Sequence, residues 1–124
     1  MKNFGILLLT FCGVTLSWAT DWPHFRGPGG QGHAEGVDVP LRWSAENAVA
    51  WKVKVPGKAW SSPVVVGDRV FVTTAVDSGK GLSLRAIALG LADGKNVWDQ
   101  EIVAKPDVGD FHKKNSHASP TPVV

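Results

Sequence analysis

Short runs of alternating hydrophobic and polar residues fill the chain from residue 48 onward. In the run 49–55, apolar side chains at alternate positions are separated by Lys52 and Lys54, which is the pattern of a strand with one buried face. Later runs are rich in Val, Phe and Thr, and Gly-Asp and Asp-Gly pairs between them favour tight turns. The pattern predicts strands at 49–55, 60–66, 69–76, 82–91, 96–103 and from 119 onward, with a bulge at Gly90.

The first 19 residues carry a different pattern, a continuous apolar run without alternation. Lys2 precedes the apolar segment 4–16, and Ser17 and Ala19 place small residues three positions and one position before a cleavage point. This order predicts a secretory signal peptide over residues 1–19. An uncleaved anchor is the alternative, but the apolar run has about 13 residues, whereas a membrane-spanning helix needs about 20. After cleavage, no transmembrane span is expected.

Composition narrows the class of protein further. The 124 residues carry a formal net charge of +2, with 44% hydrophobic and 19% charged residues, as in a folded globular domain. No basic cluster is longer than the pair at 113–114, so a nucleic acid is not an expected partner. The one cysteine, Cys12, lies within the predicted signal peptide, so the exported chain is expected to carry neither a disulfide nor a thiolate metal site. These features predict a bacterial protein exported to the periplasm or the extracellular space.

Residues 20–47 are expected to form a Gly/Pro-rich N-terminal loop. The glycines and prolines between Asp21 and Pro40 disfavour both a helix and a long strand. Trp22 and Phe25 are expected to anchor this loop by packing against the domain, because large aromatic side chains bury much apolar surface. The chain therefore divides into a signal peptide at 1–19, this loop at 20–47 and a β-rich part at 48–124.

Two internal echoes indicate repeated β units. Residues 62–65, Ser-Pro-Val-Val, recur at 121–124 as Thr-Pro-Val-Val, and the triplet 49–51, which ends in Trp, recurs loosely at 96–98. The offsets of 59 and 47 residues differ, and an insertion at 104–116 accounts for the difference. A unit of four strands with a Trp in the last strand is typical of a β-propeller blade. A β-sandwich with similar strand spacing is the alternative.

Several motifs resemble those of a known family, the secreted bacterial β-propellers of pyrroloquinoline-quinone-like (PQQ-like) repeats. Gly94 and Lys95 form a Gly-Lys turn, and Trp98 follows three residues after the lysine, as in the signature of these repeats. Three further segments are similar to the head, the opening hairpin and a downstream motif of the same family: 21–28 (DWPHFRGP), 60–71 (WSSPVVVGDRVF) and 113–122 (KKNSHASPTP). The resemblance covers essentially all of the chain that follows the predicted signal peptide.

The resemblance implies an all-β fold, a β-propeller built from four-stranded antiparallel blades with Gly94, Lys95 and Trp98 as the structural repeat. Residues 48–124 would hold a closing strand, about one blade and the start of the next. Because propellers have about four to eight blades, the sequence is expected to be a truncated N-terminal fragment. Such a propeller is expected to act as a binding or scaffold platform in the cell envelope, for a protein or small-molecule partner that the sequence does not identify. No catalytic residue, metal site or reaction is assigned.

A PQQ-dependent oxidoreductase is the main alternative function, because quinoprotein dehydrogenases of this fold bind PQQ together with calcium. Many PQQ-like propellers carry the repeat for structure alone, and fold does not imply function. No cofactor is expected here, since the chain after residue 19 has no cysteine pair and no acidic cluster suited to calcium. A carbohydrate binder is a third possibility that rests only on the number of tryptophans.

The polar segment before the last predicted strand holds the candidate ligand residues. Lys114, Asn115 and His117 are expected to reach a ligand if the protein has a site in this loop. His112 and His117 are five residues apart, and two histidines of this kind can help to bind a metal or an anion. Asp107 and Asp110 could supply carboxylates but are expected to be solvated loop residues, so a purely structural loop between strands is the alternative.

Overall fold

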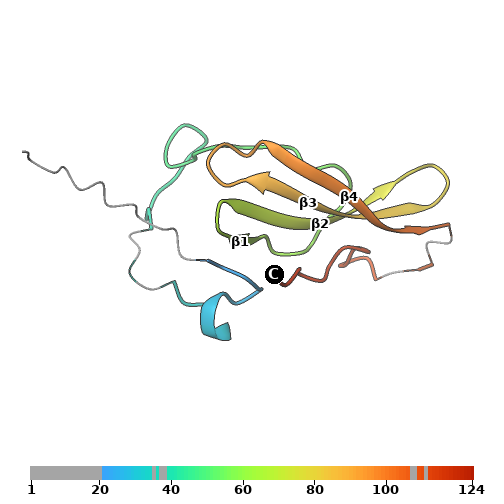
Figure 1. Ribbon diagram of the computed structural model, residues 1–124, viewed down its shortest axis with the longest axis horizontal. Helices are drawn as coiled ribbons and strands as arrows, with labels where there is room; N and C mark the ends of the chain where they lie inside the picture. Colours follow the sequence, from blue (N-terminus) through green and yellow to red (C-terminus); the bar gives the residue numbers. More distant parts are fainter. Residues whose placement is uncertain (1–20, 35, 37–38, 107–108, 111) are drawn as a thin grey trace, which may run out of the picture.

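Runs of β-branched and aromatic residues separated by tight turns fold into one antiparallel sheet of four strands. The computed structural model describes residues 21–34, 36, 39–106, 109–110 and 112–124, so the predicted signal peptide lies outside the described part. Neighbouring strands in the sheet are also consecutive in the sequence (Figure 1). They are β1 (Val64–Val66), β2 (Arg69–Asp77), β3 (Leu82–Gly90) and β4 (Asn96–Lys105), and a short 3-10 turn, η1 (Pro28–Gly30), precedes them. The predicted all-β class is confirmed, whereas the propeller stays a prediction.

The longer strands agree closely with the sequence pattern. β2, β3 and β4 begin at the predicted residues and end within two residues of the predicted ends. The bulge predicted at Gly90 is misplaced, because Gly90 pairs regularly with Arg69 of β2. The register between β3 and β4 shifts instead between Ala88 and Leu89, where β4 contributes one more residue than β3, and shifts again after Leu84.

The strand predicted at 60–66 is shorter than expected, since only its last three residues pair as β1. Pro63 has no N–H group to donate to a ladder. Ser61 replaces ladder bonds with its side chain: its Oγ accepts from the N–H of Thr73 at 3.4 Å and donates to the carbonyl oxygen of Thr73 at 3.3 Å. This segment therefore follows β2 without forming a regular strand beside it.

The strand predicted at 49–55 is wrong, because these residues form no backbone ladder. The apolar side chains of this segment lie in different environments. Trp51 and Val55 pack on the core of the sheet, and Lys52 and Lys54 between them are exposed. Val49 and Val53, the other apolar residues of the alternating pattern, are 47% and 43% exposed, so burial does not follow the pattern and the pattern alone does not establish a strand.

The strand predicted from residue 119 onward is also absent. Pro120 and Pro122 have no N–H group, which leaves few donors for a ladder. The side chain of Thr121 accepts a hydrogen bond from the N–H of Ser62 at 3.1 Å, so a side chain does part of the pairing.

The alternation of side chains gives the sheet two different faces. On the first, named here the Ile87 face, Val70, Ile87 and Leu89 form a buried cluster covered by Trp51 and Val55. The second, named the Ala88 face, carries the strand residues that alternate with those of the Ile87 face. The C-terminal segment lies against it, because the hydroxyl of Thr73 donates to the carbonyl oxygen of Pro120 at 3.1 Å. The buried apolar residues on this side are Val64, Ala75, Ala88 and Ala118.

The outer edge of β1 is covered by the head of the chain. Trp22 and Val65 exchange two backbone hydrogen bonds, of 2.7 and 2.9 Å. The N–H of Gly67 donates to the carboxylate of Asp21 at 2.8 Å. Trp22 is half-buried and holds the loop to β1 through its backbone, while its ring lies against Gly27 of the same loop. The packing predicted for Phe25 is wrong, because that residue is 62% exposed.

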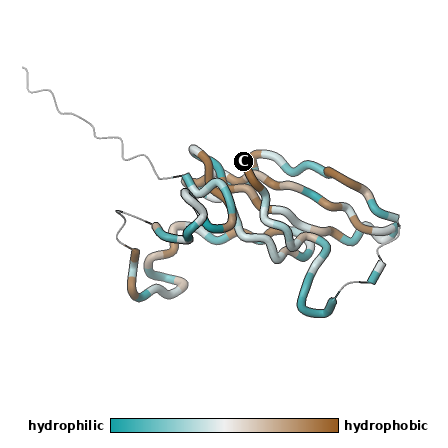
Figure 2. Tube along the Cα trace, turned by 90° about the horizontal axis from the view of Figure 1, so that it is seen from below, coloured by the Kyte–Doolittle hydropathy of each residue, from teal (hydrophilic) through white to brown (hydrophobic). Residues whose placement is uncertain are grey.

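The β4 side of the sheet is open in the described part of the chain. All ten residues of β4 are exposed. Figure 2 shows hydrophobic positions along the strands as well as in the loops. The large apolar side chains that β4 exposes are Val97, Trp98, Ile102 and Val103.

Candidate functional site

A cleft opens at the end of the sheet where β2 turns into β3. Its volume is about 610 Å³, within the range of about 300–1,000 Å³ that is typical of small-molecule sites. Its walls come from four segments: the residues before β1, the end of β2, the turn into β3, and the chain after β4. The side chains that line it include Lys58, Ala75, Asp77, Leu82, Pro106 and His117.

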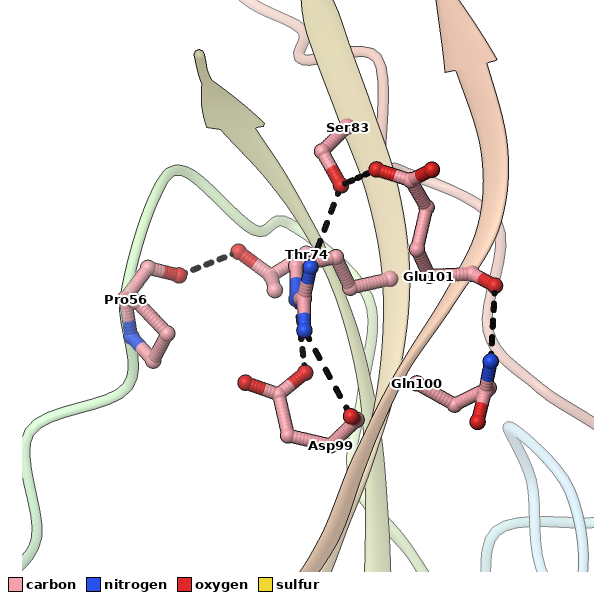
Figure 3. Close-up of polar contacts among 7 residues, drawn as sticks. Pro56, Thr74, Ser83, Asp99, Gln100 and Glu101 are labelled. Atoms are coloured by element: carbon pink, nitrogen blue, oxygen red, sulfur yellow. Dashed lines mark hydrogen bonds and ion pairs between the residues drawn. The ribbon is translucent and has the colours of Figure 1, made fainter.

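Close backbone packing forms one wall of this cleft. Thr74 donates its hydroxyl to the carbonyl oxygen of Pro56 at 2.5 Å (Figure 3). Gly57 has a φ of +79°, and a Cβ there would lie 2.8 Å from the carbonyl carbon of Ala75, so only glycine fits without displacement. Lys58 then exchanges two backbone hydrogen bonds with Ala75, of 2.9 and 3.0 Å. The segment before β1 is thereby fixed against β2, with Lys58 beside Ala75.

The turn between β2 and β3 forms a second, ordered wall. Asp77 Oδ1 accepts a hydrogen bond from the N–H of Gly79 at 2.8 Å. The N–H and the hydroxyl of Ser78 both donate to the carbonyl oxygen of Gly81, each at 2.9 Å. These bonds hold the carboxylate of Asp77 in place at the rim of the cleft.

Of the three predicted ligand residues, the structure brings one to the cleft. His117 lines it and is half-buried. Asn115 has a local role, because its Oδ1 accepts from the hydroxyl of Ser119 at 2.5 Å. Lys114 is exposed and does not line the cleft, and its N–H donates to Nδ1 of His112 at 3.2 Å.

Lys58 and Asp77 line the cleft, although no role at a site was predicted for them from the sequence. In the sequence, each is a charged residue next to a turn, where side chains are ordinarily solvated. Only the backbone bridge between residues 58 and 75 shows that the two lie at one site. A lysine after Pro-Gly and an aspartate at a strand end are too common to predict this.

The predicted structural repeat forms the turn between β3 and β4 and the start of β4. Gly94 is buried, has a φ of +67°, and lies directly against the indole ring of Trp51. Lys95 accepts, through its carbonyl oxygen, the N–H of Gly90 at 2.9 Å, which closes the turn. Trp98 packs against Phe71 with ring centroids 6.0 Å apart, and it remains 39% exposed.

The carboxylate of Asp93 and the ammonium of Lys95 form an exposed ion pair of 2.8 Å in this turn. Hydrogen bonds from the side chain and then the backbone of Lys95 hold the pKa of Asp93 below its ordinary value. The hydrogen bond to Asp93, followed by charge attraction, raises the pKa of Lys95. The ion pair therefore stabilises the turn at pH values between the lowered pKa of Asp93 and the raised pKa of Lys95. Its contribution is lost as the pH falls through the lowered pKa of Asp93 or rises through the raised pKa of Lys95.

We expect the substitution Lys95→Met to raise the pKa of Asp93 part of the way to its ordinary value. The side-chain hydrogen bond and the charge attraction disappear, but the backbone N–H of residue 95, which donates to Asp93 Oδ1 at 3.0 Å in the parent protein, is retained. Carboxyl ¹³C NMR titration measures this shift directly. Lys80→Met, at an exposed lysine in another turn, is the control and should leave the pKa of Asp93 unchanged. An unchanged pKa in Lys95→Met would contradict the assignment.

A polar network joins β3 and β4 toward the end of the sheet that holds the cleft (Figure 3). Ser83 donates its hydroxyl to Glu101 Oε2 at 2.5 Å and accepts from Arg85 Nη1 at 3.2 Å. Arg85 Nε also donates to Asp99 Oδ1 at 2.7 Å. Ser83 is 6% exposed, and its oxygen is engaged both as donor and as acceptor, so the network holds the two strands together rather than presenting a nucleophile.

Among the described residues, no group of three or more His, Cys, Asp or Glu side chains is placed to hold a metal ion. No helix in the same part of the chain is long and apolar enough to cross a membrane. Comparisons with protein families, with curated proteins and with solved structures found no match to this chain.

Proposed function

We propose that this sheet is one blade of an exported β-propeller of PQQ-like repeats, which acts as a binding platform in the cell envelope. The observation that carries the proposal is the unequal covering of the sheet. The head of the chain pairs with the outer edge of β1, whereas β4 exposes its backbone edge and four large apolar side chains. Neighbouring blades of a propeller pack face to face and would cover these apolar side chains.

The repeat residues support the same proposal. Trp98 follows the Gly94-Lys95 turn and is 39% exposed on β4. A second sheet packed on this strand would bury the rest of the indole ring, which is a large gain in buried apolar area. The proposal requires further blades, because propellers have about four to eight of them. Export is proposed from the predicted signal peptide at 1–19.

The cleft supports a binding role. It has a partly apolar floor formed by Ala75, Leu82 and Pro106, and charged groups stand at its rim. Sites for small molecules commonly combine an apolar lining with a few placed polar groups. In a propeller, loops of this kind lie at the ends of the blades, where they are accessible to partners.

We expect a cysteine placed on β4 to be protected from labelling in the native full-length protein. Ile102→Cys is suitable because Ile102 is 63% exposed in this sheet and the chain after residue 19 has no cysteine of its own. If another blade covers β4, a maleimide reagent should react at least about tenfold more slowly with the native protein than with the denatured protein. The cysteine would then be exposed only when the blades separate transiently.

Leu41→Cys is the matched control, because Leu41 is 97% exposed and lies outside the sheet. It should react at the same rate in the native and the denatured protein. Equal labelling of both cysteines in the native protein would mean that β4 faces solvent, and the propeller proposal would then fail.

A further inference from the structure

Two opposite charges stand at the rim of the cleft, on the same face of the sheet. Lys58 forms an antiparallel bridge with Ala75, so their side chains lie side by side. Asp77 is two residues further along β2 and therefore points to the same face as Ala75. Diagonal neighbours of this kind are about 7–8 Å apart.

Neither charge is neutralised within the described part of the chain. The ion pairs there join Asp68 to Arg69, Arg85 to Asp99 and Asp93 to Lys95, and all three lie away from the cleft. Asp77 Oδ1 accepts the N–H of Gly79, and no described residue donates to Oδ2. The cleft thus offers a cation and a partly fixed carboxylate to a ligand.

The space between the two charges is partly apolar. Ala75, Leu82 and Pro106 line the cleft, and Ala75 is buried. His117 also lines the cleft. A ligand that carries a carboxylate, an ammonium group and an apolar side chain matches all three features at once, because each charge meets its opposite and the side chain meets the floor.

We infer that the cleft binds small zwitterions of the amino acid class, with the ligand carboxylate at Lys58, the ligand ammonium at Asp77 and an apolar side chain on Ala75, Leu82 and Pro106. The volume of about 610 Å³ is sufficient for a free amino acid or a dipeptide. This inference rests on the proposed binding function and adds the class of ligand.

Isothermal titration of the exported full-length protein with L-leucine tests the inference, together with two truncated forms of the same ligand. 4-Methylpentanoate lacks the ammonium group, and 3-methylbutan-1-amine lacks the carboxylate. We expect leucine to bind, and each truncated ligand to bind about tenfold more weakly or worse, since one charge-assisted hydrogen bond is lost.

Two variants locate the binding in the cleft. Lys58→Met keeps the backbone bridge, and Asp77→Asn keeps an oxygen that can accept the N–H of Gly79, so both should fold as the parent does. Each should weaken leucine binding about tenfold or more. Lys54→Met and Asp68→Asn remove the same charges at exposed positions outside the cleft and should leave binding unchanged. Thermal unfolding of all four variants checks that they are folded.

Three results would overturn the inference. Leucine does not bind, or a truncated ligand binds as tightly as leucine, or the control variants weaken binding as much as the cleft variants. The cysteine labelling of β4 needs no ligand, so it reports on the propeller separately. Protection of Ile102→Cys together with any of these three results would leave the proposed platform standing and remove only the ligand class.

Discussion

Replacing Trp51 by alanine is expected to lower the free energy of unfolding by about 3 kcal/mol or more, the range for a large aromatic side chain lost from a core. The indole ring packs on the cluster of Val70, Ile87 and Leu89. Its Nε1 also donates to the carbonyl oxygen of Leu91 at 2.8 Å. Truncation therefore removes buried apolar area and leaves a carbonyl group without its donor. Denaturant unfolding of the full-length protein measures the loss.

Two further variants separate these contributions. Trp51→Phe keeps an aromatic ring on the core but has no donor for Leu91, so a loss of about 1 kcal/mol is expected from the hydrogen bond. Trp43→Ala is the control, because Trp43 is 73% exposed, and a change within about 0.5 kcal/mol is expected there. Equal losses for Trp51→Ala and Trp43→Ala would show that the segment 49–55 does not pack on the sheet.

Substituting Gly94 by alanine should also destabilise the protein strongly, by about 2–5 kcal/mol, for two separate reasons. The residue has a φ of +67°, which costs a residue with a side chain about 1–2 kcal/mol. A Cβ at this position would lie 2.5 Å from a ring carbon of Trp51, so the indole must move, and overpacking of this kind costs about 1–3 kcal/mol. Denaturant unfolding again measures the sum.

Gly67→Ala is the matched control for the backbone term. Gly67 has a φ of +59°, and a Cβ there would meet nothing within 4 Å, so only the conformational cost of about 1–2 kcal/mol is expected. Combining Gly94→Ala with Trp51→Ala should be less costly than the sum of the single changes, because the clash no longer exists. Additive losses in the double variant would contradict the packing of the ring on Gly94.

Much of the sheet could be predicted from local patterns. β2, β3 and β4 carry β-branched and apolar residues between turns that contain glycine, and their starts follow from these signals. The pattern failed at 49–55 and from 119 onward. In the first segment, Trp51 and Val55 pack on the sheet while Val49 and Val53 are exposed, and in the second, prolines remove the donors of a ladder. Alternation of apolar residues therefore does not by itself report which side chains are buried or what covers them.

The candidate site could be predicted only in part. Of the predicted ligand residues, His117 lines the cleft, whereas Asn115 bonds to Ser119 and Lys114 lies outside, and a ligand role for any of them stays a prediction. Lys58 and Asp77 are 19 positions apart in the sequence. They meet because residue 58 pairs with residue 75 across the edge of β2. A pairing between segments that form no regular strand leaves no periodic signal.

The sequence by itself determined the all-β class, the order of the three long strands and the need for glycine in tight turns. These properties depend on residue type and on neighbours along the chain. Tertiary structure alone decided that Trp51 rather than Trp43 packs on the core, that Gly94 lies under that ring, and that Lys58 and Asp77 share a cleft. The physical reason is that each of these depends on contacts between segments far apart in the chain, and a local pattern of polarity does not specify which distant segment a side chain contacts.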